Sequence, residues 1–207
     1  MFVELIELLR CPNAHEETPL VVSAERTVDR HLVQGMLGCP VCRAEFPIAN
    51  GVAEFGAAPR VRPEAPDAES AMRLAAFLEL NEVRRFAILC GRHASQADQV
   101  ARIAQTPLVL VNGPADAGNA AASMRVKDAM PFAAGAAHAA ALDESVVPAL
   151  AASIVAVVRP GGRVVGPASM APPAGVREIV RDDRMWVAEK IAAPVDPAPR
   201  LVTLKRA

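Results

Sequence analysis

The chain has 207 residues, of which 52% are hydrophobic and 22% are charged, so it can hold one ordinary domain and a small module and is too apolar to be disordered. Aromatic residues make up only 3%, and there is no tyrosine, which argues against a stacking platform for single-stranded nucleic acid. The net charge of −1 gives no overall attraction to a polyanion and leaves only local basic patches open.

The first segment, residues 2–9, places apolar side chains at helical spacing and predicts a short amphipathic helix. Pro12 ends this helix just after Cys11. Residues 20–22 and 31–37 are typical of strands, and the second strand leads directly into a pair of cysteines.

Four residues of this first part have the spacing of a metal site. Cys39 and Cys42 are separated by two residues, which lets two thiolates of one tight turn reach the same tetrahedral zinc ion. Cys11 and His15 supply the matching half-site upstream. With four protein ligands the zinc would be structural, because no position is left for an activating water. The alternative is a small unit that keeps its shape by packing alone.

The sequence CPVCRAEFPIANGVAEF at 39–55 resembles the zinc-ribbon activator subunit of tRNA and release-factor methyltransferases and its short bacterial relatives. The likeness combines the cysteine pair with the patterns FPI at 46–48 and NGV at 50–52. Bacterial relatives often place a second cysteine three residues after the first, where this chain has Ala14, so His15 is the substitute. The resemblance implies a non-catalytic module that stabilises a methyltransferase by covering apolar surface and extending its sheet.

Residues 57–66 contain three prolines and little that could be buried, as is typical of a linker. The sequence therefore predicts three units: a zinc-ribbon-like domain at 1–56, a Pro-rich linker at 57–66 and an α/β domain at 67–207.

In the third unit, apolar strands alternate with helices, which predicts a mostly parallel, doubly wound sheet. The N-cap candidates of the helices are Asp67 or Ser70, then Ser95, then Asp143 or Ser145. Strands are expected at 85–90, 108–111, 124–126, 137–142 and 163–165, and an antiparallel hairpin at one sheet edge from 185–191 and 201–205.

Two segments of this unit resemble the seven-stranded fold of S-adenosylmethionine-dependent methyltransferases. DAMPFAAG at 128–135 is similar to that family's approach to its fourth strand, and VVRPGGRVV at 157–165 to the turn before its fifth. The final hairpin falls where the family has its antiparallel strands. The resemblance implies a Rossmann-like sheet and reports fold more than chemistry.

In that family the cofactor lies at the carboxyl ends of the first strands, on a Gly-rich turn and beside an acidic residue that binds the ribose. Here the turn retains one glycine, Gly91, while Asn112 replaces the acid and Asp128 matches the residue that recognises the adenine edge. These three are the cofactor-binding candidates if S-adenosylmethionine binds. Arg92 and His93 weigh against binding, because their bulk would crowd the methionine and the ribose.

Other chemically active side chains favour structural roles. Cys90 closes an apolar strand, which is typical of a small core residue rather than a nucleophile. His31 and His138 lie in or next to apolar strands. Residues 177–184 carry charges of both signs and are interpreted as a solvated face.

The favoured function is a non-catalytic pseudo-methyltransferase that acts as a binding or regulatory module. The zinc ribbon would pack on its own domain in cis or dock on a protein partner. A homodimer is a further expectation. The alternative is an active S-adenosylmethionine-dependent methyltransferase acting on RNA or protein, which lacks an Asn-Pro-Pro-Tyr substrate motif but retains 128–135. A third hypothesis places a different small ligand in the altered pocket, with Arg92 and His93 facing an anion.

The cysteine pattern and the N-terminus bear on location. Three of the four cysteines belong to the metal pattern, which favours a reducing compartment over a disulfide framework. No basic stretch precedes the apolar N-terminal residues, and no apolar run is long enough to span a bilayer. We therefore expect a cytoplasmic protein without membrane contact.

Overall fold

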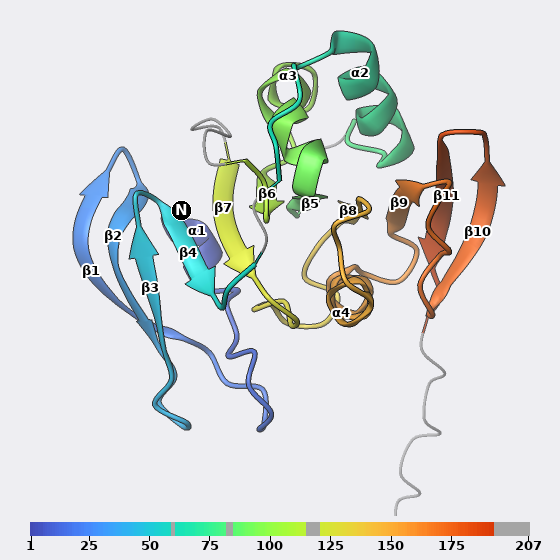
Figure 1. The fold of residues 1–207 in the computed structure, drawn as a ribbon. Coiled ribbons are helices and arrows are strands. Elements are labelled where there is room, and N and C mark those ends of the chain that lie inside the picture. Colours follow the sequence, from blue (N-terminus) through green and yellow to red (C-terminus); the bar gives the residue numbers. More distant parts are fainter. Residues whose placement is uncertain (59–60, 82–84, 115–120, 193–207) are drawn as a thin grey trace, which may run out of the picture.

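The computed structural model describes residues 1–58, 61–81, 85–114 and 121–192 (Figure 1). The helices are α1 (Val3–Ile6), α2 (Ala68–Phe77), the 3₁₀ helix η1 (Gly91–Gln96), α3 (Ala97–Ile103) and α4 (Pro148–Val157). The strands are β1 (Val21–Val28), β2 (His31–Gly38), β3 (Glu45–Ala49), β4 (Val52–Phe55), β5 (Ala87–Cys90), β6 (Leu108–Val111), β7 (Ala121–Val126), β8 (Ala139–Ala141), β9 (Arg163–Pro167), β10 (Val176–Arg181) and β11 (Met185–Lys190).

The strands of these described residues form one sheet in the order β1-β2-β3-β4-β7-β6-β5-β8-β9-β11-β10. From β7 to β9 all neighbours are parallel, whereas β11 is antiparallel to both β9 and β10. The parallel strands β7 to β9 with an antiparallel hairpin at the C-terminal edge confirm the doubly wound α/β sheet that the sequence predicts for this part of the chain.

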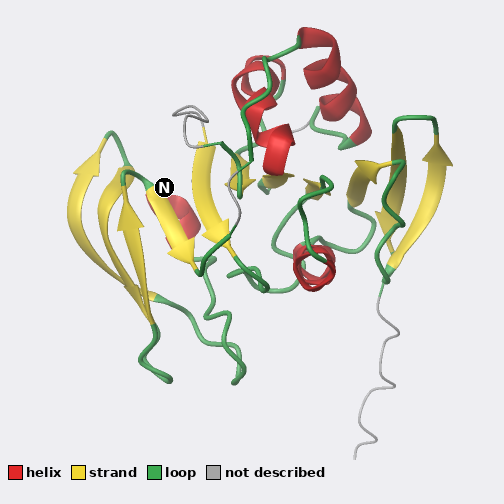
Figure 2. Cartoon of the chain, viewed as in Figure 1, coloured by secondary structure: helices red, strands yellow, loops and turns green. Residues whose placement is uncertain are grey.

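Helices cover both faces of the parallel sheet, as Figure 2 shows. Successive residues of a strand point to opposite faces, and the four residues of β5 are all buried. Ala87 and Leu89 therefore pack in the cluster that includes α2 and α3, while Ile88 and Cys90 pack in the cluster that includes α4. This double burial explains why the strands are continuous apolar runs.

The N-terminal module, residues 1–56, is an antiparallel arrangement of β1 to β4 that continues the parallel sheet. β4 pairs in parallel with β7, with Val52 opposite Ser123 and Phe55 opposite Val126. Leu37 and other buried residues of the module belong to the same hydrophobic cluster as the α4 face of the sheet. The module and the α/β sheet therefore share one hydrophobic core.

A second joint connects the chain after α1 to the segment at 128–135. The backbone N–H of Arg10 donates to the carbonyl oxygen of Pro131 at 2.9 Å, and Leu9 bridges Phe132. The centroid of the Phe132 ring in turn lies 4.6 Å from that of Phe86, the residue before β5. The segment that resembles the methyltransferase motif thus also anchors the N-terminal module.

The C-terminal hairpin differs from the prediction. β11 does pair antiparallel at the sheet edge, but its outer partner is β10 rather than 201–205, which lies outside the described residues. The prediction took 177–184 for a solvated charged face. Almost all of β10 is exposed, and an edge strand with charged residues lacks the apolar alternation by which strands are recognised.

The starts of the helices were predicted with mixed success. Asp67 is confirmed as the N-cap of α2, because its Oδ2 accepts the backbone N–H of Ser70 at 2.8 Å. Ser95 is not an N-cap: it lies inside η1, and its hydroxyl accepts the N–H of Glu64 at 3.1 Å. The N-cap of α4 is Val147, not Asp143 or Ser145, since Pro148 at the first helical position starts this helix.

Among the described residues, no helix has the length and apolar character to cross a membrane.

Candidate metal centre and cofactor crevice

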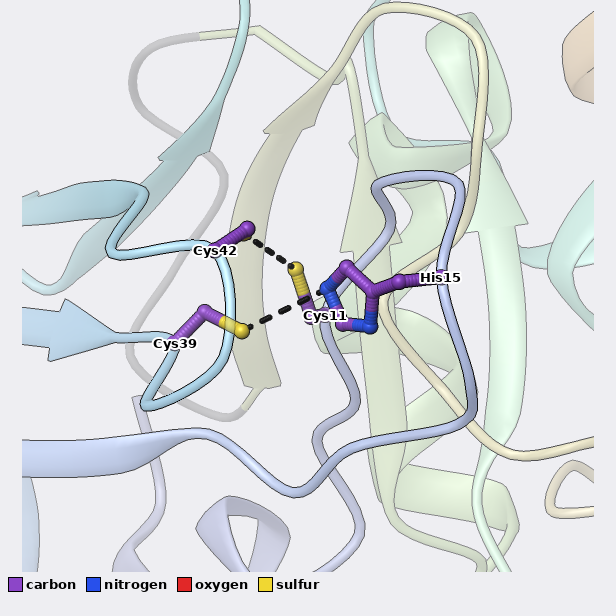
Figure 3. A group of neighbouring side chains, drawn as sticks. All are labelled: Cys11, His15, Cys39 and Cys42. Carbon is purple, nitrogen blue, oxygen red and sulfur yellow. Dashed lines mark hydrogen bonds between the residues drawn. The ribbon is translucent and has the colours of Figure 1, made fainter.

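Cys11, His15, Cys39 and Cys42 lie together in the N-terminal module (Figure 3), as their spacing predicts, and their ligand atoms are all within 4.8 Å of one another. The Sγ atoms of Cys11 and Cys42 are 3.7 Å apart, and Nε2 of His15 lies 3.4 Å from Sγ of Cys39. A tetrahedral zinc ion with Zn–S bonds of about 2.3 Å requires sulfur atoms about 3.8 Å apart. The cluster therefore has the dimensions of a zinc site.

The turn after β2 brings Cys39 and Cys42 to the same side. The N–H of Arg43 donates to the carbonyl oxygen of Cys39, and the N–H of Cys39 donates to that of Ala44, both at 2.9 Å. Arg43 has a φ of +60°, in the left-handed region that closes such a tight turn. The backbone alone thus preforms half of the ligand set.

His15 is oriented by a carbonyl oxygen. Its Nδ1 lies 2.7 Å from the carbonyl oxygen of Glu16, so the neutral ring carries its proton there and directs the lone pair of Nε2 towards Cys39. A ligating histidine commonly has this second hydrogen bond, which fixes its tautomer and ring orientation. His15 thus fills the position that Ala14 cannot.

The thiols of the cluster have opposite electrostatic environments. The backbone N–H of Ala44 and then the side-chain amide of Asn13, 3.3 Å from Sγ, lower the pKa of Cys42. Burial raises the pKa of Cys11. A bound cation would hold both sulfurs as thiolates, and three thiolates with one imidazole form a closed ligand set. Zinc at this site would link the segment after α1 to the turn after β2 and would leave no open position for catalysis.

A second feature lies between the carboxyl ends of β5 and β8, where the chain connections of the sheet diverge and α/β proteins bind their ligands. Asp143 lies at this position, which we call the crevice after its role in such sheets, and is only 3% exposed. Its Oδ2 accepts the N–H of Arg92 at 2.8 Å, while its Oδ1 accepts the N–H and the hydroxyl of Ser145 at 3.0 and 2.5 Å. A Cβ atom added at Gly91, which has a φ of +53°, would overlap this carboxylate.

The neighbouring space between the ends of β5 and β6 is filled by η1. A Cβ atom at Gly113 would overlap the side chain of Ala94, so the two turns are in close contact. Nε2 of His93 lies 3.1 Å from the carbonyl oxygen of Leu142, and burial lowers the pKa of this histidine. The bulky residues after Gly91, Arg92 and His93, are thus half-buried beside the ends of these strands.

Asn112 is buried and both polar atoms of its side chain are used. Nδ2 donates to the carbonyl oxygen of Val126 and Oδ1 accepts the N–H of Val126, each at 2.8 Å. The amide therefore links the ends of β6 and β7 by a pair of hydrogen bonds. Asp128, by contrast, is exposed beyond β7 and lies 3.6 Å from Nζ of Lys127. Of the three cofactor candidates, Gly91 borders the crevice, Asn112 connects the ends of β6 and β7, and Asp128 faces solvent.

Asp143 was predicted as a candidate helix N-cap and not as a site residue. Its position directly after the strand at 137–142 was the available signal, because polar residues at the carboxyl ends of parallel strands gather at one edge.

Cys90 is fully buried, and burial raises the pKa of its thiol. His138 is also buried, with Nε2 3.2 Å from the carbonyl oxygen of Glu79 and Nδ1 accepting Nε of Arg159 at 3.2 Å.

No family model and no curated protein matches the chain. Solved structures that match include the [4+2]-cyclase SpnF, with 16% identity, a TM-score of 0.41, and coverage of 48% of this chain and 44% of that one. Geranyl diphosphate C-methyltransferase from Streptomyces coelicolor A3(2) is 19% identical, with a TM-score of 0.40, over 48% of this chain and 42% of that one. An RNA methyltransferase from Salinibacter ruber is 15% identical, with a TM-score of 0.39, over 64% of this chain and 98% of that one. The chain thus covers less than half of the first two structures, and identities this low concern the fold alone.

Proposed function

We propose that this protein is a non-catalytic pseudo-methyltransferase with a structural zinc ribbon, which serves as a binding or regulatory module. The observation that carries the proposal is the carboxylate of Asp143 in the crevice between β5 and β8. In a doubly wound sheet this crevice receives the cofactor. Here one of the protein's own carboxylates occupies it.

The hydrogen bonds of Asp143 explain why displacement would be costly. The backbone N–H of Arg92, which could serve a ligand, is used by this carboxylate, and Ser145 satisfies the other oxygen. Breaking one buried charge-assisted hydrogen bond costs about 1.5–3 kcal/mol. A cofactor would have to replace several such hydrogen bonds with its own. The close packing of Ala94 against Gly113 would still exclude it from the space between β5 and β6.

The N-terminal module has a stabilising role in this proposal. It covers the edge of β7 with β4 and adds its apolar residues to the cluster on the α4 face of the sheet. Zinc at Cys11, His15, Cys39 and Cys42 would keep this small module folded, since a unit of this size has a marginal core of its own. Any protein partner, or a second copy of the chain, would then use surfaces other than the β7 edge.

Calorimetric titration with S-adenosylmethionine and S-adenosylhomocysteine tests the proposal. We expect no binding up to about 1 mM ligand. The Asp143→Ala variant, checked for folding by circular dichroism, would report whether emptying the crevice creates affinity. Micromolar binding to the wild-type chain would refute the proposal.

An active S-adenosylmethionine-dependent methyltransferase acting on RNA or protein is the alternative. Asp128 favours it, because this carboxylate lies two residues after the end of β7 and is exposed, so it can meet a ligand. The alternative requires η1 and Asp143 to move apart from their present contacts. Transfer of a labelled methyl group to total RNA or to a protein extract, abolished in Asp128→Ala and retained in the exposed control Asp98→Ala, would establish it.

A further inference from the structure

A cavity of about 290 Å³ lies beside the crevice, between the first turns of α2, the helix η1 and the ends of β9 and β11. Leu74, Pro167 and Met185 give it an apolar part. Its polar part includes the side chains of Arg73 and Arg92. Neither the zinc cluster nor the cofactor candidates Gly91, Asn112 and Asp128 line it.

Two arginines are the most enclosed charged residues of the cavity lining. The side chains of Arg73 and Arg92 are 32% and 33% exposed. The acidic residues of the lining, Glu64, Asp67 and Glu69, are all exposed, and so is the third arginine, Arg184. A ligand inside the cavity would therefore meet the guanidinium groups of Arg73 and Arg92 rather than the carboxylates.

These arginines have hydrogen-bonding capacity to spare. Arg73 lies 3.7 Å from Glu69 and 3.9 Å from Asp182, and its guanidinium makes no hydrogen bond with any described residue. Arg92 makes one, from Nη2 to Glu144 at 3.1 Å. Guanidinium groups present five donors in a planar fork that matches carboxylates and phosphates.

A neutral donor lies deeper in the same cavity. Gln96 is only 6% exposed, and its Oε1 accepts the backbone N–H of Asp67 at 2.9 Å. This bond fixes the orientation of the amide and leaves its NH₂ group without a hydrogen bond to a described residue. The cavity thus brings together a buried amide donor and two half-buried guanidinium groups, while the carboxylates of its lining are exposed to solvent.

We propose that this cavity binds a small oxyanion, a carboxylate or a phosphate, through Arg73, Arg92 and the amide of Gln96. The apolar residues accommodate a short carbon body, and the cavity volume limits the ligand to a small molecule. The inference rests on the proposed function, because it assigns to the module a ligand other than the methyl donor.

Calorimetric titration of the full chain at constant ionic strength, with inorganic phosphate and separately with malonate, tests this site. We expect saturable binding of at least one probe, and the tighter probe identifies the chemical class. Arg73→Gln should weaken binding about tenfold or more, the factor expected for loss of one charge-assisted hydrogen bond. The matched control Arg102→Gln removes the same charge from an exposed position of α3 and should leave binding unchanged.

Two results would overturn the site: no saturable binding of either probe to the folded wild-type chain up to about 10 mM, or equal weakening in both variants. A parallel titration with S-adenosylmethionine distinguishes failure of the anion site from failure of the proposed function. If it binds and phosphate still binds alongside, the proposed function fails and the anion site stands. If it binds and abolishes phosphate binding, the cavity is part of a cofactor site and both proposals fail.

Discussion

Replacement of Asn112 by Asp separates a structural amide from a cofactor ligand. Asp restores the acidic residue that binds ribose in the family this domain resembles, so a latent cofactor site should gain affinity from it. In the structure, however, Nδ2 of Asn112 donates to the carbonyl oxygen of Val126. An ionised carboxylate would instead place an oxygen atom against that carbonyl oxygen.

The magnitude follows from the two hydrogen bonds that join Asn112 to Val126, each 2.8 Å long and buried. In Asn112→Ala both backbone groups of Val126 lose their side-chain partner, at about 1–3 kcal/mol for each group left unsatisfied, or about 2–6 kcal/mol in total. Asn112→Asp keeps the acceptor for the N–H of Val126 and loses only the donor. At neutral pH it adds the cost of a buried charge, so we expect a loss of similar size.

The pH dependence gives this prediction a sign. Burial and the facing carbonyl oxygen raise the pKa of the new carboxyl above its unfolded value, so the folded state binds the proton more strongly. The protonated acid can also donate to Val126, as the amide does. The deficit of Asn112→Asp relative to the wild type should therefore be small at low pH and grow as the pH rises.

Urea unfolding followed by circular dichroism, at pH 5 and pH 8, measures these differences, and calorimetry with S-adenosylmethionine completes the test. The wild type is measured at each pH, which removes the pH response of the remaining groups. An Asn112→Asp variant that is as stable as the wild type at pH 8 and binds S-adenosylmethionine at micromolar concentration would refute the structural interpretation of this amide.

Three further predictions concern other parts of the chain. The purified protein should contain about one equivalent of zinc. Cys39→Ser should lose the metal and have a lower melting temperature, whereas the exposed control Ser23→Ala should change neither. Zinc retained by Cys39→Ser would exclude this ligand set. Leu9→Ala should destabilise the whole chain by about 2–5 kcal/mol in one thermal transition, because Leu9 is fully buried in the shared core, and two separate transitions would contradict that sharing. Burial lowers the pKa of His93, so the unfolded state binds its proton more strongly and stability falls as the pH drops below about 6.5. His93→Gln should flatten this loss of stability between pH 6.5 and 5. An unchanged profile of stability against pH would show that His93 is not the source of the loss.

Local patterns predicted the features that depend on local physics. The strand at 108–111 was placed at its observed bounds, because a short buried strand is an uninterrupted apolar run. The clustering of Cys11, His15, Cys39 and Cys42 was predicted because their spacing follows from a tight turn and a tetrahedral ion. Asp67 was recognised because an N-cap serves the backbone two or three residues ahead.

The features that the sequence could not predict depend on contacts between distant segments. Pairing of β4 with β7 joins residues far apart in the chain, and no residue of either strand specifies a parallel neighbour. The role of Asp143 depends on Gly91, more than fifty residues earlier, whose missing side chain makes room for the carboxylate. β10 escaped recognition because it owes its strand conformation to β11 rather than to burial.

The joint between β4 and β7 also changes how strongly the two parts must attract each other. Both are segments of one polypeptide, so their association is intramolecular and is governed by an effective concentration, in the millimolar range for short flexible connections. An interface that would dissociate between separate chains at cellular concentrations can stay closed here. A similar module supplied in trans could replace the N-terminal module only if it were present at a higher concentration or bound β7 more tightly. The covalent connection therefore excludes weakly binding modules from this edge.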